Sequence, residues 1–311
     1  MNLPLDIPIM DFHVRAYPAE VGRRTQMAMG RKNPPYDGTP EEYLDLLAQV
    51  STNKASGAVL KNVTPTGEMA KAAWDRVDRR LTPEEEHEMY GSVQEMIAGR
   101  IRRRNAWGND VTRQYPTLLN FIGVDPNFLS PQENVEELEV RVKEGARGIS
   151  LHPTRNLHQP ADRRLWPLYE RAQEMGVPFI AHSGTEGFHL AYTGLNSRPV
   201  DFVEVLDSFP RLRIVLGHMG RGYFDDAIEI AHRYPNVYFD ISGFDEASSH
   251  NYSDEEFVQL IRRFGSENLV FASGWVFGDF LERVKHLASL PMTDNEKERI
   301  FYRNAQEFLG T

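Results

Sequence analysis

The sequence contains no cysteine among its 311 residues. This absence excludes disulfide bonds, thiolate zinc sites and a cysteine nucleophile. The chain also lacks a run of 18 apolar residues, which a membrane-spanning helix requires. Its first stretch, MNLPLDIPIM, has neither the basic start nor the long apolar core of a signal peptide. We therefore expect a cytoplasmic protein without a membrane partner.

Positive charge is scarce relative to negative charge, and the formal net charge is -10. Such a balance disfavours a nucleic-acid partner. With 41% hydrophobic and 26% charged residues, the chain is long enough to bury a large core. We predict one domain over residues 1–311. The sequence leaves the oligomeric state open, a homo-oligomer included.

Short apolar segments recur eight times along the chain. Each is rich in Val, Ile, Leu or Phe and is bounded by Gly, Pro or polar residues, which is typical of buried parallel strands. Helix-like segments lie between most of them. The apolar segments are residues 7–12, 57–62, 118–124, 147–152, 177–182, 213–218, 237–242 and 269–274.

Two of the predicted helices carry clear start signals. Thr39 precedes Pro40, and Ser130 precedes Pro131, so each pair supplies an N-cap followed by proline at the first helical position. Eight strands alternating with helices predict an α/β fold, a (β/α)8 TIM barrel. The alternative is a doubly wound open sheet, which is disfavoured because no glycine-rich phosphate loop follows the first strand.

One interval is too long for a plain barrel unit. About 55 residues separate the second and third apolar segments, and most of them have a helical pattern. We predict that residues 66–112 are a helical insertion after strand 2 that caps the barrel mouth. This interval contains the basic run RIRRR at 100–104. The run is either a solvated basic helix end or a dock for an anionic substrate tail, such as a phosphate or a carrier.

Four histidines end predicted strands: His13, His152, His182 and His218, with Asp11 two residues before the first. In a barrel, the carboxyl ends of the strands surround one small space, so these side chains could converge there. Imidazole and carboxylate ligands together suit a divalent transition metal such as Zn, Fe or Mn. The sequence therefore predicts a site for one or two metal ions.

Several fragments resemble those of the amidohydrolase-related (amidohydrolase family 2) proteins. They are MDFH, GISLHP, PFIAHSG, IVLGHMG, NVYFDISG and LVFASGW, and they extend over nearly the whole chain. The resemblance implies a metal-bearing TIM barrel that performs hydrolysis or non-oxidative decarboxylation. It places the first-strand His-x-His pair on His13 and Arg15, a ligand on His182, a ligand or acid–base group on His218, and Gly274 where the family has an aspartate.

Two of these positions depart from the family pattern. Arg15 replaces a ligand, and its guanidinium could instead grip an anionic substrate. Gly274 leaves no side chain to take the proton of an attacking water. Glu186 is the preferred replacement, as ligand or proton carrier, because its loop leaves the barrel directly after the fifth strand. The other candidate carboxylates are Asp240, Asp245, Glu246 and Asp279.

We thus predict a metal-dependent enzyme that hydrolyses or decarboxylates a small organic acid, free or carrier-linked. A non-haem iron oxygenase with one or two irons, or a non-catalytic ligand-binding member, are the alternatives. The predicted catalytic residues are His218, Glu186 and Arg15. The predicted metal ligands are Asp11, His13, His152, His182, His218 and Glu186, and the predicted substrate contacts are Arg15, His189, Phe244 and Trp275.

Overall fold

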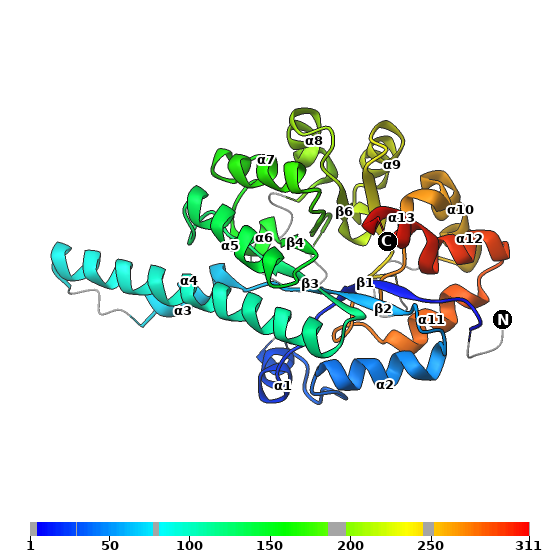
Figure 1. Ribbon diagram of the computed structural model, residues 1–311, viewed down its shortest axis with the longest axis horizontal. Coiled ribbons are helices and arrows are strands. Elements are labelled where there is room, and N and C mark those ends of the chain that lie inside the picture. The colour runs from blue at the N-terminus through cyan, green and yellow to red at the C-terminus, as the bar shows by residue number, and fades with distance from the viewer. Residues whose placement is uncertain (1–4, 29, 77–80, 186–196, 245–251, 311) are drawn as a thin grey trace.

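The computed structural model describes residues 5–28, 30–76, 81–185, 197–244 and 252–310. Eight parallel strands form one sheet in the order of the sequence, and helices surround it (Figure 1). The strands are β1 (Met10–Val14), β2 (Gly57–Lys61), β3 (Leu118–Gly123), β4 (Gly148–Leu151), β5 (Phe179–Ala181), β6 (Ile214–Leu216), β7 (Val237–Asp240) and β8 (Leu269–Val270).

The sheet closes on itself between its first and last strands. The Phe12 N–H of β1 donates to the carbonyl of Phe271, directly after β8, at 2.8 Å. The (β/α)8 barrel predicted from the sequence is therefore confirmed, and the open-sheet alternative is wrong. Each apolar segment that was predicted as a strand overlaps one; β1 continues past the end of its segment to Val14, and the other seven strands lie within theirs.

Helices follow the strands and cover the outside of the barrel (Figure 1). They are α1 (Ala19–Ala28), α2 (Pro40–Val50), α3 (Thr66–Trp74), α4 (Pro83–Gln114), α5 (Pro131–Lys143), α6 (Pro153–Asn156), α7 (Trp166–Met175), α8 (Val203–Ser208), α9 (Phe224–Arg233), α10 (Asp254–Phe264), α11 (Phe280–Ser289), α12 (Asp294–Glu298) and α13 (Asn304–Leu309). Within the described ranges, no helix combines the length and the apolar character needed to cross a membrane.

The predicted helix starts are confirmed in detail. The Thr39 side chain accepts a hydrogen bond from the Glu42 N–H, and the Glu42 carboxylate accepts one from the Thr39 N–H. Ser130 and Glu133 make the same reciprocal pair at the start of α5. These capping boxes satisfy N–H groups that have no partner inside the helix, so local sequence fixes where α2 and α5 begin.

The long interval after β2 folds into α3 and α4. The 32-residue α4 extends beyond the barrel together with α3, while its C-terminal part runs along β3 (Figure 1). Val93, Ile97, Ile101 and Leu129 form a small apolar cluster of their own under the middle of α4. The interval is therefore helical, as predicted; that residues 66–112 cap the mouth stays a prediction.

Two glycines of α4 allow a matched test of its packing. Gly108 faces the side chains of Asn62 and Asn120 so closely that a Cβ would overlap their amide groups, whereas nothing lies within 4 Å of a Cβ at Gly91. We expect Gly108→Ala to lower the free energy of unfolding by about 2 kcal/mol, because overpacking outweighs the better helix propensity of alanine.

Gly91→Ala is the control and should raise the same free energy by up to about 1 kcal/mol. Urea denaturation of both variants and the wild type measures the difference. Equal effects of the two substitutions would show that α4 is not packed against the asparagines.

Candidate metal centre

His13 and Asp240 form a buried pair at the carboxyl ends of β1 and β7. The distance between His13 Nδ1 and Asp240 Oδ2 is 2.9 Å, and both side chains are almost fully buried. The other oxygen, Asp240 Oδ1, accepts hydrogen bonds from the His218 N–H at 2.9 Å and from the Ser242 N–H at 3.0 Å. Asp240 thereby fixes both β1 and the turn after β6.

His218 lies in a tight turn, Gly217–Gly220, directly after β6. Its backbone has a φ of 58°, an uncommon conformation for a residue other than glycine and one that recurs at functional sites. Ser242 Oγ lies 2.8 Å from His218 Nδ1 and so fixes the ring. The candidate ligand atoms of His13, His218 and Asp240 all lie within 4.8 Å of one another.

The other two predicted strand-end histidines lie beside this group. The His182 ring centroid is 5.0 Å from that of His218. His152 stacks on the far side of His182, with centroids 4.4 Å apart and the rings nearly parallel. The predicted convergence of the four histidines at the barrel mouth is therefore what the structure shows; their individual roles as ligands stay predictions.

Burial sets the protonation of this cluster. It lowers the pKa of His13 to about 4, and it lowers the pKa values of His152, His182 and His218 well below the usual range. Burial by itself raises the pKa of Asp240, but the charge and hydrogen bond of His13 and the nearby cations outweigh it and hold that pKa well below normal. Neutral imidazoles beside an ionised carboxylate are the donor set that a divalent transition metal requires.

Cations stand around the same group. Lys61 ends β2 and is 1% exposed, and its positive charge lowers the pKa values of His13, His152 and His182. Arg15 acts on the same three histidines, and Arg221 acts on His182 and His218. The mouth therefore holds one carboxylate of the described part of the chain among several positive charges.

Sequence reasoning missed Lys61 and Ser242, and it gave Asp240 less weight than Glu186. A usable signal exists for Lys61: it is the last residue of an otherwise apolar strand, GAVLK, so its side chain emerges at the mouth. Ser242 gave no signal, since a serine after a strand is common in turns. Glu186 and His189 lie outside the described residues.

Asp11, whose role as a metal ligand stays a prediction, is held by hydrogen bonds from four groups. Its carboxylate accepts hydrogen bonds from the N–H of Ser273 at 3.0 Å, the Oγ of Ser273 at 2.5 Å, the N–H of His13 at 3.0 Å and the hydroxyl of Tyr43 at 3.2 Å. Burial raises its pKa to about 6. Asp11 therefore ties β1 to the segment after β8, and it does not belong to the group formed by His13, His218 and Asp240.

The aromatic residues predicted to line the substrate pocket pack inside the protein. Trp275 is fully buried, with its ring centroid 5.4 Å from that of Tyr43. Phe244 stacks on Phe257 with a centroid distance of 5.1 Å. Their proposed contacts with substrate stay predictions. Gly274 has a φ of +70°, and a Cβ there would lie 3.7 Å from the Cβ of Ser242, beside the histidines.

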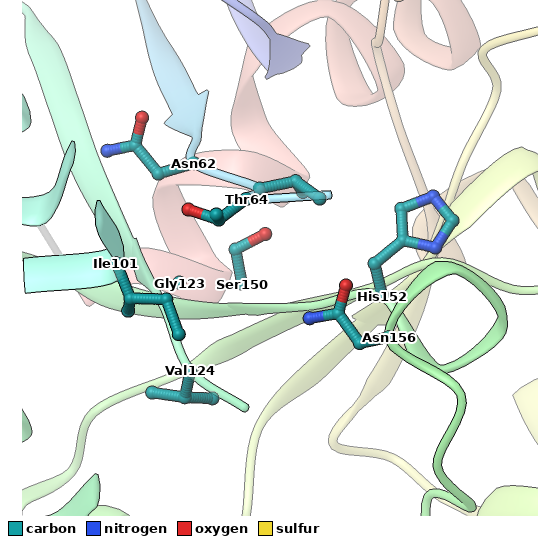
Figure 2. Close-up of a pocket in the computed structure, with 9 residues that line it drawn as sticks. Asn62, Thr64, Ile101, Gly123, Val124, Ser150, His152 and Asn156 are labelled. Atoms are coloured by element: carbon teal, nitrogen blue, oxygen red, sulfur yellow. The ribbon is translucent and has the colours of Figure 1, made fainter. Parts of the chain in front are cut away.

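A narrow polar pocket adjoins His152. Its lining includes Asn62, Thr64, Ser150 and Asn156, which surround a common space with His152 at one end (Figure 2). Ser150 Oγ and Asn156 Oδ1 are buried and have no hydrogen-bond partner among the described atoms. Unsatisfied buried oxygens of this kind offer hydrogen-bonding capacity to a ligand. The narrow pocket therefore places unsatisfied polar atoms beside His152.

The amidohydrolase family model matches residues 10–311. The chain belongs to the amidohydrolase family. Among curated relatives, it is 22% identical over 172 residues to gamma-resorcylate decarboxylase of Polaromonas sp. (strain JS666 / ATCC BAA-500), a match that covers 45% of this chain and 53% of that protein. It is 30% identical over 121 residues to dihydroorotase of Helicobacter hepaticus (strain ATCC 51449 / 3B1), covering 36% of this chain and 33% of that protein.

This member of the amidohydrolase family thus spans about half the length, or less, of those curated relatives. Among solved structures, its fold matches that of a dihydroxybenzoic acid decarboxylase from Polaromonas sp. JS666 with bound manganese and an inhibitor, 2-nitroresorcinol. The TM-score is 0.65, the identity is 17%, and the match covers 98% of this chain and 97% of that one.

Proposed function

We propose that this protein is a metal-dependent enzyme that removes the carboxylate of a small aromatic acid as CO2. The observation that carries the proposal is the convergence of neutral imidazoles, one ionised carboxylate and several cations on one buried point of the barrel mouth. The imidazoles and the carboxylate suit a divalent ion, and the cations suit the carboxylate of a substrate. The decarboxylases named above, one of them with bound manganese, support the same reading.

Decarboxylation suits this site better than hydrolysis does. Hydrolysis at a metal needs a group that takes the proton of the attacking water, and position 274, where the resemblance expects an aspartate, is glycine. Loss of CO2 requires no water nucleophile. It requires a proton for the ring carbon that bears the carboxylate; the carbon–carbon bond then breaks, and its electron pair returns to the ring.

Different residues of this chain would bind the metal, transfer the proton and bind the substrate. His13 and Asp240 would hold the ion together with the neighbouring imidazole of His182, which leaves His218 for proton transfer. The ion, when bound, supplies a Lewis acid that polarises oxygen atoms of the substrate. We assign the proton transfer to Nε2 of His218, because Ser242 Oγ holds its Nδ1 at 2.8 Å. The neutral Nε2 would take the hydroxyl proton of a hydroxybenzoate and pass it to the ring carbon, and the phenolate left after CO2 departs would be protonated by water. Lys61 and Arg15 neutralise and orient the substrate carboxylate.

An oxygenase remains a second candidate, because histidines with one carboxylate also describe non-haem iron sites. One experiment separates the possibilities. Protein loaded with manganese, zinc or iron is incubated in D2O with a panel of hydroxybenzoates, and the products are identified by NMR.

Decarboxylation predicts CO2 release and a single deuterium at the carbon that lost its carboxylate. Hydrolysis of esters or lactones without CO2 release would contradict the proposal. Oxygen consumption that depends on iron would establish the oxygenase, and binding without turnover on every metal would indicate a non-catalytic member.

A further inference from the structure

The basic run at 100–104 is divided between two faces of α4. Ile101 is buried, and Arg102 pairs with Glu133 of α5 at 2.6 Å. Arg103 and Arg104 follow Arg100 by three and four residues, which places both of them beside Arg100 on the helix surface. Among the ion pairs of the described residues, none involves Arg100 or Arg103.

These three arginines line a cavity of about 430 Å³, which Arg15 and Arg155 also line. Its walls come from α1, the segment after β2 and α4, and they include apolar side chains such as Val63 and Met96. No acidic residue of the described chain is among its lining residues. The nearest carboxylate with a recorded contact is that of Glu68, 3.6 Å from Arg155. Arg100, Arg103 and Arg104 thus share one cavity, and none of the three has an ion pair within the described residues.

Arg104 is fixed in this wall. Its guanidinium lies over the rings of Tyr17 and Trp107, at 4.6 and 4.5 Å from their centroids, and it donates to the carbonyl of Ala16. Burial lowers the pKa of Arg104 to about 10, and the charge of Arg100 contributes. The guanidinium is still charged at neutral pH, so the cavity wall contains a rigid, partly desolvated cation that can bind an anion.

The cavity lies next to the candidate metal centre. Arg15 follows His13 by two residues, and Arg155 lowers the pKa of His152 through its charge. Val63 and Thr64 line both the cavity and the narrow pocket beside His152 that Figure 2 shows. The cavity and the candidate site are therefore neighbours, with Val63 and Thr64 between them.

We propose that this arginine-lined cavity binds the phosphate or diphosphate group of an extended organic substrate whose carboxylate reacts at the barrel mouth. Guanidinium groups bind phosphate oxygens in a two-point fashion, and several of them around one cavity match an anion of more than one charge. The volume is that of a pocket for a small organic ligand, larger than inorganic phosphate needs. The placement of the carboxylate rests on the proposed function, whereas binding of the phosphate does not.

Calorimetric titration with phenyl phosphate, a weak metal chelator, tests the proposal on metal-loaded protein at fixed ionic strength. Arg100→Gln combined with Arg103→Gln should weaken binding at least about tenfold, because two charge-assisted contacts are lost. Arg102→Gln is the matched control: it also removes a positive charge from this run but faces Glu133, and it should bind as the wild type does. Melting curves establish that all variants are folded.

Three results would overturn the proposal. The first is a dissociation constant above about 1 mM for phenyl phosphate and the wild type. The second is a loss of affinity in Arg102→Gln as large as that in the Arg100→Gln/Arg103→Gln variant. Either would mean that the arginines form only a diffuse positive surface and not a specific site. Inorganic phosphate that binds as tightly as phenyl phosphate would make the free anion the ligand and exclude an organic substrate tail. Because these titrations do not require turnover, they test phosphate binding even if no decarboxylation is observed.

Discussion

Purified Asp240→Asn protein is expected to contain less than about a tenth of the divalent metal found in the wild type, since loss of one of few ligands removes much of the binding free energy. Asp240 is the carboxylate of the group that includes His13 and His218, and the charges around it keep it ionised. Asparagine removes the negative charge while Lys61 and Arg15 remain, so a dication would meet net repulsion. Turnover on any substrate from the hydroxybenzoate panel should be lost with the metal.

Elemental analysis of the two proteins, loaded and washed in parallel, measures this effect. Asp254→Asn is a suitable control, because Asp254 also pairs with a histidine, His286, at 3.0 Å, but on the surface. That variant should retain the metal of the wild type. Equal metal content in Asp240→Asn would show that the ion is held elsewhere.

Lys61→Met should lower kcat/KM about 100-fold without lowering the metal content. Lys61 is a buried cation whose charge affects the pKa values of His13, His152, His182 and Asp240. It is therefore close enough to these residues to contact the carboxylate of a substrate bound among them. Removal of one preorganised charge from a water-poor site typically costs a factor of roughly 100 to 1,000 in rate. A metal ion gains nothing from this lysine, because the two positive charges repel each other.

Steady-state kinetics, metal analysis and a melting curve on the same preparation separate these effects. Lys71→Met, on the exposed surface of α3, changes the same charge and should leave all three measurements unchanged. A rate for Lys61→Met within threefold of the wild type would remove Lys61 from the substrate site. A fall in metal content would mean that Lys61 supports the ligands and does not hold the substrate.

Much of the fold could be read from local sequence. Buried parallel strands are continuous apolar runs, and each predicted run overlaps a strand. Thr39 and Ser130 begin their helices as predicted, because a cap depends only on residues within one turn. The proximity of the four strand-end histidines could also be predicted from the sequence, because the parallel strands of a closed barrel all end at the same face.

Part of the site could not be read in this way. His13 and Asp240 are 227 residues apart in the chain, and only the closed barrel brings them to 2.9 Å. Spacing predicts Asp11 as a ligand, and only the folded protein shows that Ser273 and Tyr43 donate hydrogen bonds to its carboxylate. Which carboxylate joins the histidines therefore depends on contacts between strands, and a single sequence does not encode such contacts locally.

The basic run at 100–104 shows the same division. By itself the sequence determined a helix with several positive charges near the barrel, because helical periodicity and charge are local properties. The tertiary structure decided which charges are compensated: α5 supplies Glu133 to Arg102, while α1 and the segment after β2 close a cavity over Arg100, Arg103 and Arg104. The physical reason is that electrostatic energy depends on distance through space and on burial, and the fold sets both of these.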